Sequence, residues 1–138
     1  MFEFKLEIIT PERVFYSGMA EQIIVESVNG RLAVLAKHAP MIAAVKVGKI
    51  EIKKKGEMLI AFSTDGFMEV RPDETLVFAQ KCEWPEEIDV KRAQADEEIA
   101  QEMLLKKQSL REYKESQLML SRAMTRLRII NSQYKMDR

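Results

Sequence analysis

The sequence predicts an α+β protein in which a β-module over residues 1–84 precedes a hairpin of two antiparallel helices over residues 85–138. Three observations support this. Apolar and charged residues alternate with a period of two over residues 2–8, as in a half-buried strand. Further short runs of strand-forming residues continue up to residue 84. Beyond Pro85 the chain contains no glycine or proline and is rich in strong helix formers.

The strand-forming runs of the β-module are short and regularly spaced. They cover residues 22–28, 32–35, 44–47, 50–53, 59–63, 67–70 and 76–80. Turn-forming pairs such as Asn29-Gly30, Lys55-Gly56 and Asp65-Gly66 separate them. Short strands at this spacing, without an intervening helical pattern, favour a β-sandwich or a flattened barrel.

Both helices of the second module carry start signals. Asp89 is placed to cap a helix that begins near Val90. Ser109 and Glu112 have the spacing of a capping box, which predicts a second helix over residues 110–131. The apolar spacing predicts one inward stripe on each helix: Ala93, Ala100, Met103 and Leu104 on the first, and Tyr113, Gln117, Leu120, Met124 and Leu127 on the second.

The charges of this module suggest two alternative states. Residues 86–102 hold seven acids and two bases, whereas residues 106–138 hold nine bases and three acids, so the segments complement each other in a hairpin. The connector Lys106-Lys107-Gln108-Ser109 contains no helix breaker. A straightened rod, roughly 65 Å long at 1.5 Å per residue, is therefore open to the same sequence. A ligand or a partner could shift such a balance.

Composition excludes several classes of function. The net charge is zero, which gives no general attraction to nucleic acid. No apolar run approaches 18 residues and the N-terminus is not a signal peptide, so we expect a cytosolic protein without direct membrane insertion. Cys82 and His38 are the only residues of their kinds, and we expect no disulfide, metal site or catalytic residues.

Two segments resemble a known family. The stretch from Gly30 to Pro40, GRLAVLAKHAP, is similar to the signature of the epsilon subunit of bacterial F-type ATP synthase. The stretch from Asp65 to Val70, DGFMEV, resembles the second glycine turn of that family, in which Gly-Gly-Phe is usual where this chain has Asp65 first. The order, spacing and length of the whole chain fit the same family.

The resemblance implies a ten-stranded β-sandwich and a set of partners. The sandwich would bind the gamma subunit and the c-ring in the central stalk, at the cytoplasmic face of the membrane. His38, Ala39 and Pro40 would lie at that interface, although a purely structural turn is the alternative for His38. The helical tail would either fold on the sandwich or extend into the alpha/beta catalytic head, where it inhibits ATP hydrolysis.

The resemblance also implies a regulatory ATP site without catalysis. The residues Ile88, Asp89, Arg92 and Ala93 match the family motif Ile/Leu-Asp-x-x-Arg-Ala, and Glu83 matches a family position near the adenine. Arg122 and Arg126, one turn apart, would add positive charge for the phosphates. No glycine-rich phosphate loop is present. The alternative is that Asp89 is only a helix cap and that the arginines only form ion pairs.

Two rival functions remain open at this stage. A small hydrolase would require catalytic residues that the sequence does not supply. A free-standing ATP-sensing adaptor on a β-sandwich would bind ATP but not gamma, so co-purification with gamma separates it from a rotor subunit.

Overall fold

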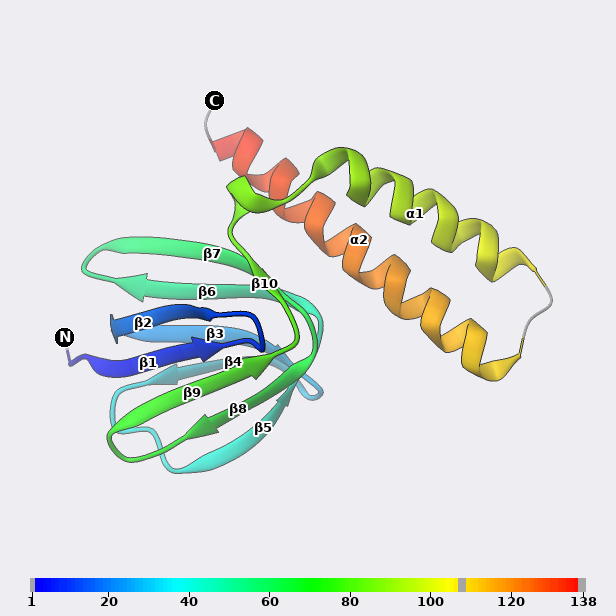
Figure 1. The fold of residues 1–138 in the computed structure, drawn as a ribbon. Coiled ribbons are helices and arrows are strands. Elements are labelled where there is room, and N and C mark those ends of the chain that lie inside the picture. Colours follow the sequence, from blue (N-terminus) through cyan, green and yellow to red (C-terminus); the bar gives the residue numbers. More distant parts are fainter. Residues whose placement is uncertain (1, 107–108, 137–138) are drawn as a thin grey trace. The chain divides into compact units, whose positions relative to one another are not determined.

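The computed structural model describes residues 2–106 and 109–136, and its contacts divide the chain into two compact units (Figure 1). The first unit ends at Trp84 and the second begins at Pro85. The first contains β1 (Phe4–Ile9), β2 (Val14–Ala20), β3 (Gln22–Ser27), β4 (Gly30–Leu35), β5 (Met41–Val45), β6 (Gly48–Lys54), β7 (Glu57–Ser63), β8 (Gly66–Val70), β9 (Glu74–Ala79) and β10 (Cys82–Glu83). The second contains the 3-10 turn η1 (Pro85–Glu87), α1 (Val90–Leu105) and α2 (Leu110–Met136).

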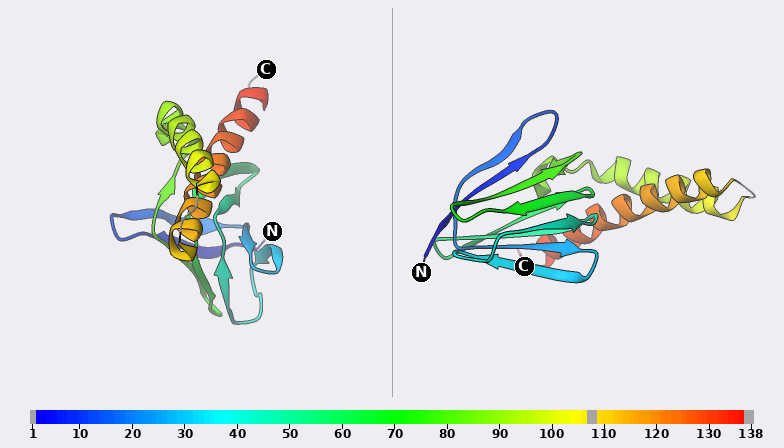
Figure 2. Two further views of the ribbon diagram at one scale, coloured as in Figure 1. Left: turned by 90° about the vertical axis from the view of Figure 1, so that its right-hand side faces the viewer. Right: turned by 90° about the horizontal axis from the view of Figure 1, so that it is seen from below.

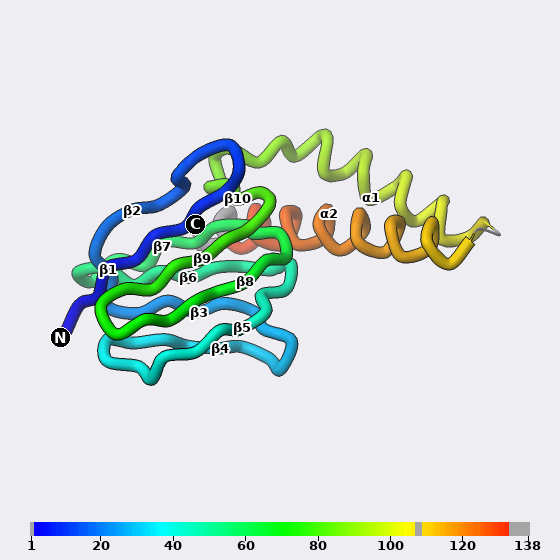
Figure 3. Tube along the Cα trace, turned by 60° about the horizontal axis from the view of Figure 1, so that its bottom comes forward, coloured from blue at the N-terminus to red at the C-terminus, as the bar shows by residue number. Residues whose placement is uncertain are grey.

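The strands of the first unit form one hydrogen-bonded path that curves around a shared interior (Figure 3). Its order is β10-β7-β6-β3-β5-β8-β9-β1-β2, with β4 added beside β3. Neighbours are antiparallel except β1 and β9, which run parallel. The most buried core side chains are Leu6, Ile8, Ile23, Val25, Val34, Ile50, Ile52, Met68 and Val77. The ten-stranded sandwich implied by the resemblance is confirmed.

Strands with a clear apolar pattern were predicted from the sequence, whereas strands without regular alternation were missed. In β1, Phe4, Leu6 and Ile8 are buried as expected, while Phe2 precedes the strand and is 72% exposed. The strand β2 was missed because the adjacent Phe15 and Tyr16 are both buried, which breaks the period of two. A register shift between β1 and β2 marks this irregularity. The strand β10 is too short to produce a pattern.

The helical unit is an antiparallel hairpin (Figures 1 and 2). Its first helix begins after the predicted cap, and its second begins at Leu110, where the Glu112 backbone N–H donates to Ser109 Oγ at 3.2 Å. The second helix continues to Met136, past the predicted end. The part of the connector at residues 107–108 lies outside the described residues.

The inward stripe predicted for α1 is confirmed at Ala93 and Ala100, whereas Leu104 is half-buried and Met103 is exposed. The stripe predicted for α2 is wrong at its exposed members, and only Leu120 and Leu127 are half-buried. Small side chains at Ser116 and Ala123 are buried there, whereas Tyr113 and Met124 remain about 40% exposed. Small residues on both helices let the two backbones approach closely. The buried positions Ala93, Ala100, Ser116 and Ala123 are called the small-residue seam below. The Ser116 hydroxyl is satisfied locally, since it donates to the Glu112 carbonyl at 2.9 Å.

Candidate functional site

Asp89 caps the N-terminus of α1. Its backbone is extended, and its Oδ1 accepts a hydrogen bond from the Arg92 backbone N–H at 3.1 Å. The Asp89 carbonyl accepts from the Ala93 N–H at 2.9 Å, which is the first bond of the helix. The capping role weighed from the sequence is therefore present, and the exposed carboxylate also lies at the positive end of the helix dipole.

The remaining motif residues at the start of α1 divide between core and surface. Ile88 and Ala93 are buried, at 7% and 2% exposure. Arg92 is exposed and lies one turn into the helix. The apolar members of the motif therefore hold the helix start in place, while Asp89 and Arg92 present polar groups to solvent.

The other ATP-site candidates come from α2 and from the sandwich. Arg122 and Arg126 are half-buried and four residues apart, which places them on one face of α2. This helix packs against both η1 and α1 within the helical unit. The structure therefore brings the motif helix and the arginine helix together. Glu83 is half-buried and belongs to β10 of the sandwich unit.

The His38 turn between β4 and β5 is ordered by local bonds. Lys37 has a positive φ of 65°, and the His38 backbone N–H donates to the Leu35 carbonyl at 3.3 Å. The ring Nδ1 lies 2.8 Å from the Ala39 carbonyl oxygen, so Nδ1 carries a proton and donates there. Ala39 and Pro40 are exposed beside it. These bonds order the turn, and its exposed residues present a surface.

A surface that the sequence reasoning missed lies on the outer side of β5, β8, β9 and β1. Side chains alternate along each strand between the core and the outer face. At one end of these strands the outward-facing side chains are apolar instead of polar. Strand register places Ala44 beside Phe67, Phe67 beside Phe78, and Phe78 beside Ile9. The outer apolar patch, as we call it, consists of the row Ile9, Ala44, Phe67 and Phe78, together with Ile42, which lies two residues from Ala44 along β5 and is paired with Glu69 at the border of the charged end.

This outer apolar patch is well exposed and partly hollow. Ile42 is 74% exposed and Phe67 is 47% exposed. The Phe67 and Phe78 rings stack with centroids 4.9 Å apart. Beside them is a hollow of about 340 Å³, lined by Ile9, Thr10, Pro11, Asp65, Gly66, Phe67, Phe78, Ala79 and Gln80. Exposed apolar groups gathered around a hollow are typical of a protein-binding surface.

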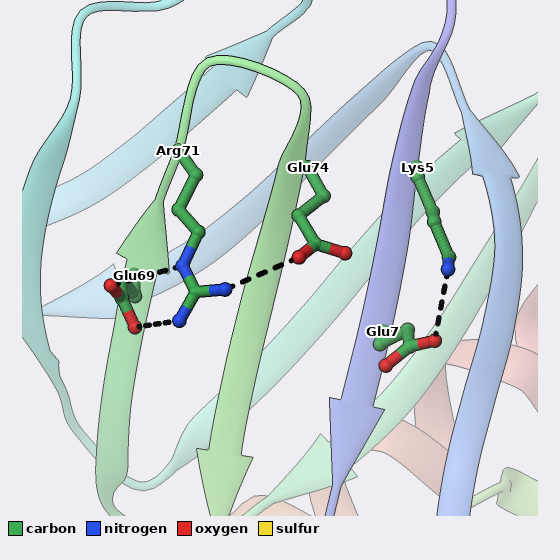
Figure 4. Close-up of polar contacts among 5 residues, drawn as sticks. All are labelled: Lys5, Glu7, Glu69, Arg71 and Glu74. Carbon is green, nitrogen blue, oxygen red and sulfur yellow. Dashed lines mark hydrogen bonds and ion pairs between the residues drawn. The ribbon is translucent and has the colours of Figure 1, made fainter.

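The opposite end of β8, β9 and β1 is charged and internally paired (Figure 4). The Arg71 guanidinium makes two bonds to the Glu69 carboxylate, at 3.1 and 3.3 Å, and one to Glu74 at 3.3 Å. These carboxylates raise the pKa of Arg71, chiefly because Glu69 accepts hydrogen bonds from the guanidinium. Lys5 Nζ lies 3.5 Å from Glu7 Oε1. The charges at this end satisfy one another, which leaves the apolar end as the unsatisfied part of the surface.

The signal for this patch was present in the sequence but was not used. Runs such as residues 67–70 and 76–80 contain apolar residues at both parities. Such runs indicate strands with two covered faces. The sandwich core covers one face, so the second apolar parity implies a further partner.

The single cysteine lies in the core, and the acidic side chains are dispersed. Cys82 is buried at 3% exposure, and burial raises the pKa of its thiol. Across residues 2–106 and 109–136, no group of three or more His, Cys, Asp or Glu side chains is arranged to hold a metal ion. Within the described part of the chain, no helix has the length and hydropathy of a membrane span.

Comparison with known proteins matches both units. The model of the ATP synthase delta/epsilon chain β-sandwich domain matches residues 3–85, and that of its long α-helix domain matches residues 86–131. The ATP synthase epsilon chain of Ruminiclostridium cellulolyticum is 45% identical, over 95% of this chain and 98% of that protein. That of Caldanaerobacter subterraneus subsp. tengcongensis is 42% identical, over 96% and 97%.

Solved structures share the fold at low sequence identity. A chain of the Euglena gracilis mitochondrial ATP synthase aligns with a TM-score of 0.79 at 16% identity, over 89% of this chain and 78% of that one. A chain of the Tetrahymena thermophila mitochondrial ATP synthase, in a structure of its central stalk and c-ring, aligns with a TM-score of 0.66 at 14% identity, over 94% and 97%. Since both domain models match in order and relatives above 40% identity are covered almost end to end, the chain belongs to the ATP synthase delta/epsilon chain family.

Proposed function

We propose that the chain is a non-catalytic central-stalk subunit of a bacterial F-type ATP synthase and that its outer apolar patch binds the gamma subunit. The patch carries the proposal, because it gathers exposed apolar side chains from neighbouring strands, whereas the charges at the opposite end of these strands pair with one another. Burying the largely exposed Ile42 against a partner would contribute up to about 1.5–3 kcal/mol, and the half-buried Phe67 would contribute less.

The same proposal assigns the other partners of the family. The His38 turn, with exposed Ala39 and Pro40, would contact the c-ring. The helical tail would reach the alpha/beta catalytic head when it extends. The subunit would then be held at the cytoplasmic face of the membrane through the assembled enzyme.

Substitution of Ile42 by serine tests the gamma contact. We expect about tenfold or greater loss of affinity for purified gamma, because a largely exposed aliphatic side chain no longer becomes buried on binding. The free energy of unfolding of the isolated chain should hardly change. Surface plasmon resonance against immobilised gamma and urea unfolding measure the two quantities.

Val28→Ser provides the matched control for this test. Val28 is also β-branched and is 62% exposed, but it lies outside the outer apolar patch. An equal loss of affinity in both variants would show that any added surface polarity weakens binding. It would contradict the proposal that the outer apolar patch binds gamma. Unchanged binding in both variants would move the gamma contact elsewhere.

We also propose that the tail has an extended, inhibitory state. The folded hairpin buries small side chains in its seam and leaves Tyr113 and Met124 exposed on a second stripe of α2. Leu120 and Leu127 continue the same spacing of three and four residues but are half-buried. The exposed Tyr113 and Met124 support a second partner for this side of α2, which would be gamma and the catalytic head in the extended state.

The regulatory ligand that we propose for the folded state is ATP. Asp89 and Arg92 present polar groups at the start of α1, and α2 supplies Arg122 and Arg126 within the same unit. A ligand that binds only the folded tail stabilises it by about 2.7 kcal/mol at a hundredfold excess over Kd. High ATP would then hold the tail folded, and low ATP would release it to inhibit hydrolysis.

Calorimetric titration with ATP tests this site. We expect binding to the unmodified chain and its loss in Arg92→Ala, because the guanidinium provides a planar donor pair for phosphate. Lys91→Ala removes the neighbouring exposed base and should bind ATP nearly normally. Asp89→Ser retains a capping oxygen, so loss of binding there assigns the carboxylate to the ligand. Absence of binding at millimolar ATP would contradict the proposal that the chain senses ATP, and the role of Asp89 would then be that of a helix cap.

A further inference from the structure

The strand β10 is the last part of the sandwich before the helical tail, and few backbone pairs hold it to the sheet. It contains two residues, which pair with Phe62 and Ser63 of β7. Just before it, Lys81 and Thr64 bind each other: the Thr64 backbone N–H donates to the Lys81 carbonyl at 3.0 Å, and the Lys81 N–H donates to Thr64 Oγ1 at 3.0 Å. So short a ladder is expected to fray unless side chains reinforce it.

The strands β10 and β2 are the two ends of the strand path, and no ladder joins them within the described residues. Side chains from the start of β2 nevertheless reach β10. Arg13 Nη2 donates to the Cys82 carbonyl at 3.1 Å, across 69 residues of sequence. The Phe15 ring stacks on the Trp84 ring, with centroids 4.3 Å apart and planes 24° apart. The Arg13 guanidinium carbon lies 5.1 Å from the centre of the Phe15 ring.

These contacts are stronger than ordinary surface contacts. Phe15 is buried, so its stack with Trp84 is largely shielded from water. The donor in the Arg13–Cys82 bond is charged, which strengthens a hydrogen bond relative to a neutral pair. Together they fix the backbone of β10 at Cys82 and its exit at Trp84, where the ladder to β7 ends.

We propose that Arg13, Phe15 and Trp84 form a clamp that closes the seam between β2 and β10 and holds the base of the helical tail. Motion of the tail then begins at Pro85, and β10 stays on the sandwich. The clamp itself rests on sandwich contacts alone. Its consequence for the tail rests on the proposed mobility of that tail.

The chain carries two natural reporters of this clamp. Trp84 is the single tryptophan and Cys82 is the single cysteine. With the clamp closed, the thiol is buried, and burial raises its pKa, so reaction with a disulfide reagent such as DTNB requires β10 to open. Tryptophan emission reports the loss of the stack directly.

Phe15→Leu is the decisive variant because it removes the ring but keeps an apolar side chain in the core. In the isolated full-length chain we expect Cys82 to react with DTNB about tenfold faster or more, and Trp84 emission to shift to longer wavelength. Phe78→Leu breaks the other stacked pair of the same sandwich and should leave both readings within about twofold. Equal readings in the two variants would overturn the clamp.

Arg13→Gln guards against a folding artefact, because Arg13 is exposed and its loss leaves the core intact. It should raise the DTNB rate several-fold with an unchanged midpoint of urea unfolding. An unchanged rate would remove Arg13 from the clamp and overturn the proposal as stated.

The place of the hinge is tested with Ala100→Leu, which loosens the small-residue seam of the hairpin. We expect faster amide exchange in α1 and α2 with an unchanged DTNB rate of Cys82. Faster reaction of Cys82 as well would show that motion spreads into β10 and would overturn the hinge at Pro85. Unchanged helix exchange would show that the small-residue seam does not hold the hairpin, while the Phe15→Leu result still decides the clamp.

Discussion

Replacing Gly66 by alanine is expected to lower the free energy of unfolding of the sandwich by about 4 kcal/mol or more, a large share of the stability of a small domain. An ideal Cβ at Gly66 would lie 1.8 Å from the Phe78 carbonyl oxygen and 2.9 Å from Ala79 Cα. Both atoms belong to the backbone of β9, to which Gly66 is paired at the start of β8. Relief of the clash requires the two strands to separate, because no flexible side chain is available to move.

The measurement is urea unfolding followed by circular dichroism, with Gly18→Ala as the control. A Cβ at Gly18 would meet only the Tyr16 side chain, at 3.4 Å, which is an ordinary contact. The control removes a glycine from a strand by the same chemical change, and its stability should change by less than about 1 kcal/mol. Similar stability in the two variants would show that β8 and β9 tolerate the separation, and would contradict the close approach at Gly66.

The dependence on Gly66 also bears on the family signature. The usual Gly-Gly-Phe turn has Asp65 in its first position in this chain, and Asp65 is exposed. The second position, Gly66, is the one that meets the β9 backbone. Asp65, which departs from the family pattern, therefore stands where a side chain has room. The retained Gly66 stands where a side chain would clash with the backbone of β9.

The sequence was sufficient for features that depend on local patterns. Alternation identified β1, and capping residues located the starts of both helices, because each signal comes from neighbouring residues. Strand order was beyond reach, since the parallel pair of β1 and β9 joins segments about 70 residues apart. The count of ten strands came from the family resemblance.

The candidate sites show the same division between local and tertiary information. The Asp89 cap was predicted because it depends on the next few residues. The outer apolar patch was missed because it depends on the register of four strands, which aligns Phe67, Phe78 and Ile9. The stripe of α2 was wrongly assigned because spacings of three and four residues fit more than one face of the helix, and the spacing alone did not select the face that packs. The hairpin instead buries Ser116 and Ala123, whose small side chains permit close packing.

Ala100→Leu is expected to weaken the pairing of α1 with α2 by about 2 kcal/mol, which corresponds to roughly 30-fold faster amide exchange through hairpin opening. Ala100 is fully buried in the small-residue seam, so three further carbon atoms cannot be accommodated without separating the helices. A difference in helix propensity does not account for the expected loss of stability, since alanine and leucine are both strong helix formers. Hydrogen exchange measured by mass spectrometry on the full chain resolves the two helices.

Ala95→Leu makes the same chemical change on the exposed side of the same helix and should leave exchange within about twofold of the unmodified chain. Equal exchange in the two variants would show that the seam does not hold the hairpin. If the seam does hold it, the functional consequences follow from the two-state tail. In the proposed two-state tail, the apparent affinity for ATP falls in proportion to the folded fraction, and the population of the extended, inhibitory tail rises. Ala100→Leu should then make the assembled enzyme hydrolyse ATP more slowly at low ATP, whereas Ala95→Leu should not.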